Sequence, residues 1–250
     1  MKRAWFSEGL RFALRSLGKR SLNPFRLVHR VTWWAGRVLF GPRCFLLKNR
    51  QIPYFLHPLV INTERIVEIS LGRRFLEGED PAEVLEIGNV LAVFSRVDHR
   101  VVDKYEPGSG VENLDIMDFQ PDERLRRILC LSTLEHVGID EEPRDERKAL
   151  LALKKIPSWL TSEGEALITI PLGHHPRLDT WLTGERGRTR EDELTESLPG
   201  AQISFLQRQN AWNVWRQVDR GTARGARYGY PFACANVVAV IYLQGETRQP

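Results

Sequence analysis

The stretch VLEIGNVLA, residues 84–92, decides the fold class of this chain. It begins as an apolar run that ends in Glu86 and Gly88, which is the pattern of a strand entering the first loop of a nucleotide-binding βα unit. Asn89 and the apolar residues 90–92 follow where a loop that cradles phosphates has further glycines. A pyrophosphate needs those glycines to approach the backbone, so the stretch argues against NAD and ATP. It leaves open a cofactor without phosphate, or a strand that merely ends in Glu-x-Gly.

Composition bounds the class of protein. With 250 residues, 42% of them hydrophobic, the chain can bury the core of one large domain, or of one domain with an appendage. Its three cysteines, Cys44, Cys130 and Cys234, show neither a pairing rhythm nor the spacing of metal ligands. The sequence therefore predicts no disulfide framework and no zinc site, and a reducing cytoplasm fits best.

Positive charge is concentrated at the N-terminus. Residues 1–50 hold 12 Lys or Arg against the single acid Glu8, a balance of +11, while the other 200 residues hold 24 against 31, a balance of −7. Within this segment RAWFSEGLRFALRSLGKR, residues 3–20, has the period of a basic amphipathic helix. Such a helix can bind an anionic membrane surface or dock on the folded domain. Nucleic acid is the least favoured partner, because no recognised module follows.

The next segment is not expected to cross a membrane. VTWWAGRVLFGPRCFLL, residues 31–47, is apolar but interrupted by Arg37, Pro42 and Arg43, whereas a span needs about 20 mainly apolar residues. The preceding segment is also too long and too basic for an ordinary signal peptide. We therefore expect a basic N-terminal segment over residues 1–60, a folded domain over residues 61–250, and a protein that is not exported and lies at most on the inner face of a membrane.

The rest of the chain alternates between strand and helix patterns. Apolar spacing predicts a helix within residues 63–78 and another within residues 140–160. Strands are expected at 84–87, 100–103, around 111–114, at 127–132 and at 166–171, with one or two more within 203–218 and a last one near 235–244. Strands separated by helices indicate an α/β fold with a mostly parallel sheet and helices on both faces.

Polar residues gather where these strands end, and the carboxyl ends of parallel strands are where such sheets bind ligands. Asp103 closes the second strand 17 positions after Glu86, close to the spacing of an acid that accepts both hydroxyls of a ribose. Asp115 closes the third apolar run more directly than Asp118 does, and a carboxylate there can accept the amine of an adenine. Either acid can instead cap a turn.

At this point the sequence resembles the class I S-adenosylmethionine-dependent methyltransferases. The likeness is carried by VLEIG (84–88), VVDKYEP (101–107), NLDIMDF (113–119), ILCLSTLEHVG (128–138) and LTSEGEALITIPLG (160–173), and it covers about residues 60–245. The last two segments look like bacterial small-molecule and sugar-modifying methyltransferases. The resemblance implies a Rossmann-like sheet of seven strands whose last strand is antiparallel, with S-adenosylmethionine as cofactor and a sugar, glycan precursor or other small molecule as methyl acceptor.

The resemblance and the strand ends together give a set of candidate site residues. The residues expected to bind the cofactor are Glu86, Gly88, Asn89, Asp103, Lys104, Asp115, Ile116, Ser132 and Thr133. His136 is the candidate general base, because histidine takes up a proton near neutral pH. The competing interpretation is that Glu135 and His136 only open a helix or shape the pocket.

The acceptor is expected to meet the loop after the fifth strand. The candidates are Glu135, His174, His175, Arg177 and Tyr228. Arginine suits an acidic acceptor such as a sugar phosphate, although a plain polar loop explains this stretch equally well. Adjacent histidines do not easily chelate one ion from an extended chain, so no metal is predicted. A noncatalytic binding or scaffold protein that keeps the fold and acts through its basic segment is the alternative function.

Overall fold

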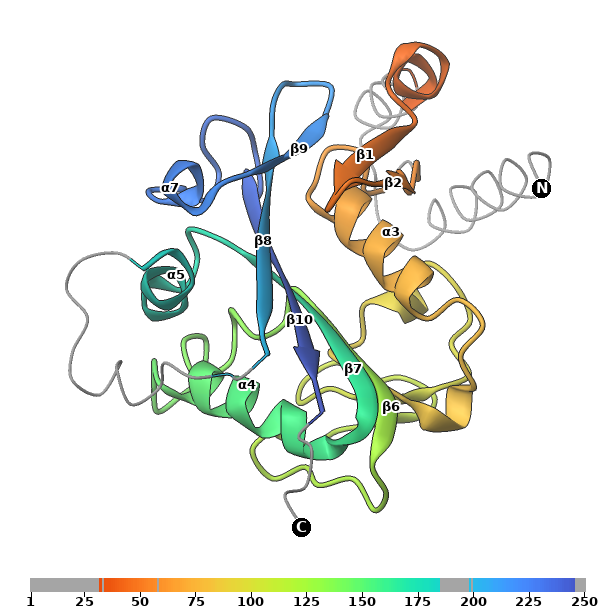
Figure 1. The fold of residues 1–250 in the computed structure, drawn as a ribbon, viewed down its shortest axis with the longest axis vertical. Coiled ribbons are helices and arrows are strands. Elements are labelled where there is room, and N and C mark those ends of the chain that lie inside the picture. The colour runs from red at the N-terminus through yellow and green to blue at the C-terminus, as the bar shows by residue number, and fades with distance from the viewer. Residues whose placement is uncertain (1–31, 33, 58, 185–197, 199, 246–250) are drawn as a thin grey trace.

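The computed structural model describes residue 32 and residues 34–57, 59–184, 198 and 200–245. Most of the expected basic segment, including the amphipathic helix predicted over residues 3–20, lies outside the described residues. The described chain forms one large sheet with helices packed against it and a small separate hairpin (Figure 1).

Eight strands make the large sheet. In spatial order they are β5 (Val111–Glu112), β4 (Arg100–Val102), β3 (Val84–Ile87), β6 (Leu125–Leu131), β7 (Leu160–Pro171), β10 (Val237–Gln244), β8 (Gln202–Arg208) and β9 (Trp215–Val218). The pairs from β5 through β7 are parallel, whereas β10 is antiparallel to both of its neighbours.

This order confirms the predicted Rossmann-like α/β fold. The opening stretch forms β3 at the centre of the sheet, and all four of its residues are buried, as expected of a strand covered on both faces. The predicted last strand is β10, and it is antiparallel as expected. The sheet differs from the prediction in having an eighth strand, because β9 folds back on β8 as a further antiparallel edge.

Helices cover both faces of the sheet, as the alternating pattern predicted. Helix α3 (Arg65–Phe75) packs on one face together with apolar side chains of β6 and β10. Helices α4 (Lys148–Trp159) and α5 (Pro176–Thr183) bury their apolar sides on the other face. Short helical turns lie at Pro81–Glu83, Leu91–Val93 and α7 (Arg220–Ala223). Apolar side chains on both sides of the central strands therefore form two cores that fix the strand ends in place.

A hairpin before α3 also belongs to this packing. Strands β1 (Cys44–Leu47) and β2 (Arg50–Pro53) pair antiparallel and bury Phe45, Leu47 and Ile52 with the α3 side of the sheet. Arg37 is buried, stacks 4.6 Å over the Tyr54 ring, and donates from Nε to the Trp212 carbonyl at 2.8 Å. The boundary expected at residue 60 therefore falls after a stretch that already packs on the folded domain.

Within the described residues, no helix is both long enough and apolar enough to cross a membrane.

Candidate functional site

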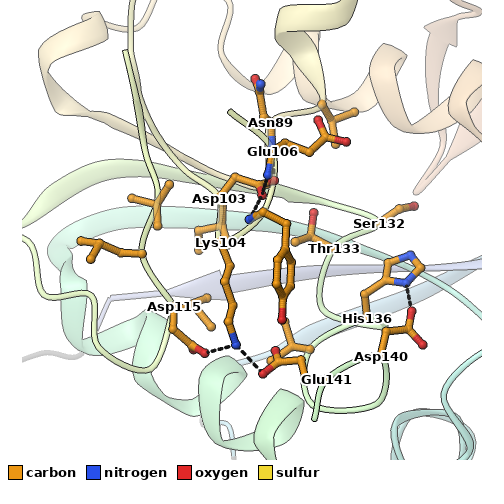
Figure 2. A pocket seen from close by; sticks show the side chains of 18 of the residues that line it. Asn89, Asp103, Lys104, Glu106, Asp115, Ser132, Thr133, His136, Asp140 and Glu141 are labelled. Atoms are coloured by element: carbon orange, nitrogen blue, oxygen red, sulfur yellow. Dashed lines mark hydrogen bonds and ion pairs between the residues drawn. The ribbon is translucent and has the colours of Figure 1, made fainter. Parts of the chain in front are cut away.

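A pocket of about 470 Å³ opens at the carboxyl ends of β3, β4, β5 and β6 (Figure 2). Strand order reverses between β3 and β6, and open α/β sheets bind ligands at such a switch point. The wall includes every residue predicted to bind the cofactor except Glu86, and it also includes the candidate base His136. Further lining residues are Arg65, Ile87, Val90, Val102, Tyr105, Glu106, Leu114, Val137, Asp140 and Glu141.

The loop after β3 has one glycine at the point where it needs one. Gly88 has φ +85°, a left-handed conformation, and a Cβ at this position would overlap Thr133 Oγ1 and lie 2.9 Å from Thr133 Cβ. Asn89 follows, and its side-chain Oδ1 is buried with no hydrogen-bond partner among the described residues. At this point of the pocket wall the Thr133 side chain packs against the Gly88 backbone, and the next residue, Asn89, carries the unpaired acceptor.

Glu86 lies behind this loop rather than on the pocket wall. Its carboxylate is fully buried, and Oε1 accepts from the backbone N–H groups of Val90 and Leu91 at 3.0 and 2.8 Å. His99 Nε2 lies 2.9 Å from Oε2. The two bonds to Glu86 hold the backbone of this loop in a tight turn.

Asp103 forms the next part of the wall at the end of β4. Its Oδ2 accepts from Asn89 N at 2.9 Å, and its Oδ1 accepts from the backbone of Tyr105 and Glu106 at 2.8 and 2.7 Å. A carboxylate can accept about four hydrogen bonds, so one position remains for a ligand hydroxyl. Asp103 thus joins the loop after β3 to the loop after β4.

Asp115 belongs to a cluster of four charges across the lower part of the pocket. Lys104 Nζ lies 2.8 Å from Asp115 and 2.7 Å from Glu141 (Figure 2). Lys148 also contacts both carboxylates. Burial raises the pKa of Asp115, but the bonds from Lys104 and Lys148 outweigh it and hold the pKa at about 2. We call Lys104, Asp115, Glu141 and Lys148 the ionic cluster.

The loop after β6 supplies the third wall. Ser132 has φ 41° and donates its hydroxyl to the buried Glu68 of α3. Thr133 donates to the Leu131 carbonyl at 3.0 Å, so its side chain is held beside Gly88. Arg65 reaches the same carbonyl at 3.2 Å while pairing with Glu68, and thereby brings one positive charge to the pocket.

His136 and Asp140 stand one helical turn apart on this loop. His136 Nδ1 lies 2.6 Å from Asp140 Oδ2, and about half of each side chain is exposed. A carboxylate on one ring nitrogen fixes the tautomer and leaves the other nitrogen for chemistry. The neighbouring Glu135 instead points inward and is buried, and its Oε2 has no hydrogen-bond partner in the described part of the chain. Burial, with the nearby Glu68, raises the pKa of Glu135 well above its usual range.

The predicted acceptor residues separate into two groups. His174 lies against the site, with its ring 4.7 Å from the His136 ring and 5.8 Å from that of Tyr228. His175 is buried and caps α5, since its Nδ1 accepts from Leu178 N at 3.3 Å. Arg177 lies in α5, is partly buried and is not on the pocket wall. Of the residues predicted in the loop after β7, only His174 thus contacts His136, and Tyr228, from the loop before β10, contacts His174.

Sequence reasoning missed three charged residues of the site. Asp140, Glu141 and Lys148 lie in the charged stretch 140–148, which looks like a solvated helix face. The structure brings Asp140 to His136 and joins Glu141 and Lys148 to the ionic cluster. The i, i+4 spacing of His136 and Asp140 was a usable signal for the first contact, whereas nothing local signals the second.

Neither a protein-family model nor a curated protein matches the chain. Among solved structures, it is similar to the N-methyltransferase NodS from Bradyrhizobium japonicum WM9 in complex with S-adenosyl-L-homocysteine, at 14% identity over 74% of this chain and 88% of that one, with a TM-score of 0.43. Coclaurine N-methyltransferase shows 14% identity over 97% and 87%, with a TM-score of 0.39. The glycopeptide N-methyltransferase MtfA, complexed with S-adenosyl-L-methionine, shows 14% over 71% and 87%, with a TM-score of 0.33. At such identities and TM-scores, the fold assignment rests on the strand order of the chain itself.

Proposed function

We propose that this protein is an S-adenosylmethionine-dependent methyltransferase that transfers a methyl group to an oxygen or nitrogen of a sugar, glycan precursor or other small acceptor. One observation carries the proposal: all the residues expected to bind the cofactor except Glu86 line one pocket at the switch point of the sheet, although they come from strand ends spread over 46 positions, from Gly88 to Thr133. Residues so far apart in sequence share one cavity because the parallel strands end at the same edge.

The polar groups present fit this cofactor. Asp103 has one acceptor position left for a ribose hydroxyl, and the unpaired Oδ1 of Asn89 needs a donor. Asp115 would face the adenine amine, and Gly88 lies on the same pocket wall. The cofactor supplies a methyl group on a sulfonium, which is transferred by in-line displacement, so the protein has mainly to align the acceptor and remove its proton.

His136 is the residue for which we propose that last role. Its imidazole is on the pocket wall and partly exposed, so an acceptor can reach it. With Nδ1 bonded to Asp140, Nε2 is the nitrogen that takes the acceptor's proton. We also propose that His174, whose ring contacts that of His136, and Tyr228, whose ring contacts that of His174, touch the acceptor.

Calorimetric titration with S-adenosylmethionine and S-adenosylhomocysteine tests the proposal. We expect saturable binding by the parent protein and a loss of at least about tenfold in affinity for Asp103→Ala, which corresponds to one good hydrogen bond to a charged group. Asp118→Ala is the matched control, because Asp118 is an exposed acid of the next loop that does not line the pocket. If the folded parent protein gave no binding heat with either compound, the proposal that it is a methyltransferase would be wrong.

One set of contacts favours the alternative of a noncatalytic protein with this fold. Asp103 already accepts three backbone hydrogen bonds, and Asp115 is already paired with two lysines. Carboxylates that already have hydrogen-bond and ion-pair partners within the protein contribute less binding free energy to a ligand. The same titration separates the two functions, because a scaffold acting through its basic N-terminal segment would bind neither cofactor nor product.

A further inference from the structure

Three side chains of the types that bind metal ions lie close together at the rim of the pocket. His136 Nδ1 is 2.6 Å from Asp140 Oδ2, and His174 Nε2 is 3.4 Å from the same oxygen. One ligand atom from each residue lies within 4.8 Å of the other two. We call His136, Asp140 and His174 the rim cluster.

Local structure places these side chains without any ion. Asp140 N donates to the His136 carbonyl at 3.1 Å, so the two residues project from the same face of one turn. His174 follows Gly173, whose φ of +93° and whose N–H, bonded to Asp179 Oδ2 at 2.9 Å, fix the turn after β7. The rim cluster therefore joins the loop after β6 to the loop after β7, and its two histidines are 38 positions apart in the sequence.

We propose that the rim cluster binds a divalent transition-metal ion of the zinc, cobalt or iron class. Two imidazoles and one carboxylate are the donors that such ions prefer, whereas magnesium and calcium prefer oxygen alone. Ligand atoms on one tetrahedral ion lie about 3.3 Å apart, so the His136–Asp140 pair, at 2.6 Å, has to open by about 0.7 Å. Both side chains are about half exposed and can rotate that far.

The exposed position also leaves room on the ion for further ligands. His174 is the most covered member, with 30% of its side chain exposed, and the two others are half exposed. Three protein ligands with open positions are typical of sites that bind water or substrate rather than purely structural sites. His136 and Asp140 line the pocket, so a group bound to the ion would lie at its rim.

Metal binding changes the role of His136. An imidazole that binds an ion through Nδ1 carries its proton on Nε2, and that nitrogen can no longer accept one. If the proposed function holds, the ion and the base role of His136 exclude one another, and bound metal switches off proton removal. Metal binding itself does not depend on the proposed function.

Titration of the full chain, purified without a histidine tag, with Zn²⁺ by calorimetry and with Co²⁺ by visible absorption tests the site. We expect one ion per chain, Co²⁺ bands of imidazole coordination, proton release on binding, and no comparable heat with Mg²⁺. Asp140→Asn and His174→Ala should each weaken binding at least about tenfold. Glu142→Gln is the matched control, since it removes one exposed negative charge two residues from Asp140 and should leave affinity unchanged.

The variants need only be folded, which their thermal unfolding shows, and no cofactor or acceptor is required. Failure of the parent protein to bind Zn²⁺ or Co²⁺ would overturn the proposal. So would binding that Asp140→Asn and His174→Ala leave unchanged, since the ion would then lie elsewhere. Neither result bears on S-adenosylmethionine binding, which the titration of the cofactor measures separately.

Discussion

The loop after β3 requires a glycine at position 88, because the backbone there is left-handed and Thr133 fills the space of a side chain. In Gly88→Ala, the left-handed backbone costs about 1–2 kcal/mol and the overlap with Thr133 adds about 1–3 kcal/mol. We therefore expect the free energy of unfolding to fall by about 2–5 kcal/mol in urea titrations. Gly110→Ala is the control, because Gly110 has φ +80° but no atom within 4 Å of an added Cβ. Equal losses for the two variants would show that the Thr133 contact is unimportant.

The lowered pKa of Asp115 predicts how the free energy of unfolding depends on pH. Its pKa of about 2 in the folded protein lies below its ordinary value of 3.8, so the stabilisation is complete above about pH 5 and is lost as pH falls from about 4 through 2. The shift corresponds to about 2 kcal/mol. Urea unfolding at several pH values should show a shallower acid loss for Asp115→Asn than for the parent, whereas Asp118→Asn should follow the parent. If the free energy of unfolding depended on pH in the same way for the parent and for Asp115→Asn, the ionic cluster would not stabilise the folded protein.

For single site residues, the sequence predicts which of them lie at strand ends but not which way their side chains point. Strand ends identified Asp103 and Asp115 as pocket residues, because an acid after an apolar run is a local signal. Glu86 has the same local signal, yet its carboxylate turns inward to two backbone N–H groups. Lys148 has no signal at all, since its partner Asp115 is 33 residues away. Which way a side chain turns is decided by such long-range partners.

Helix α3 is joined to the sheet by one buried carboxylate. Glu68 accepts from the hydroxyls of Ser132 and Thr169, the latter at 2.9 Å, and pairs with Arg65 at 3.2 Å. Glu68→Ala removes one partner from a buried ion pair, so we expect a loss of about 3–5 kcal/mol in the free energy of unfolding. Glu77→Ala, two residues beyond the exposed end of the same helix, should change it by less than about 0.5 kcal/mol. A loss below about 1 kcal/mol for Glu68→Ala would show that apolar packing alone holds α3.

Prediction was most accurate for the elements that bury apolar residues. The strand expected at 84–87 is β3, and the one expected at 127–132 is β6, displaced by one or two residues. Strand β7 begins at Leu160, six residues before its predicted start. Residues 161–165, TSEGE, belong to the strand, but they are mostly polar and only one of them is buried, so they lack the apolar pattern of a strand. The β1–β2 hairpin was not predicted, because its short apolar segments read as part of a basic tail. Its burial depends on the surface that α3 and the sheet provide.

Charge is divided between two parts of the molecule. Residues 1–31 hold eight Lys or Arg against Glu8, a balance of +7, so the other 219 residues have a balance of −3 within the total of +4. Long-range attraction to an anionic surface therefore belongs to the first part of the chain. Residues 34–57 have to stay in any truncated protein, because Arg37 and the β1–β2 hairpin pack on the folded domain.

Deletion of residues 1–31 tests whether this charge binds the protein to membranes. Each Lys or Arg near an anionic bilayer contributes about 1 kcal/mol, so the full chain should float with phosphatidylserine vesicles and the shortened chain should not. Because the attraction is screened, flotation of the full chain should also decrease between about 0.1 and 1 M salt, and it should be weak on vesicles of phosphatidylcholine alone. Circular dichroism of the shortened chain checks that it stays folded. Equal flotation of both chains would place the membrane contact elsewhere, and no flotation of either would leave the basic segment docked on the protein or bound to another partner.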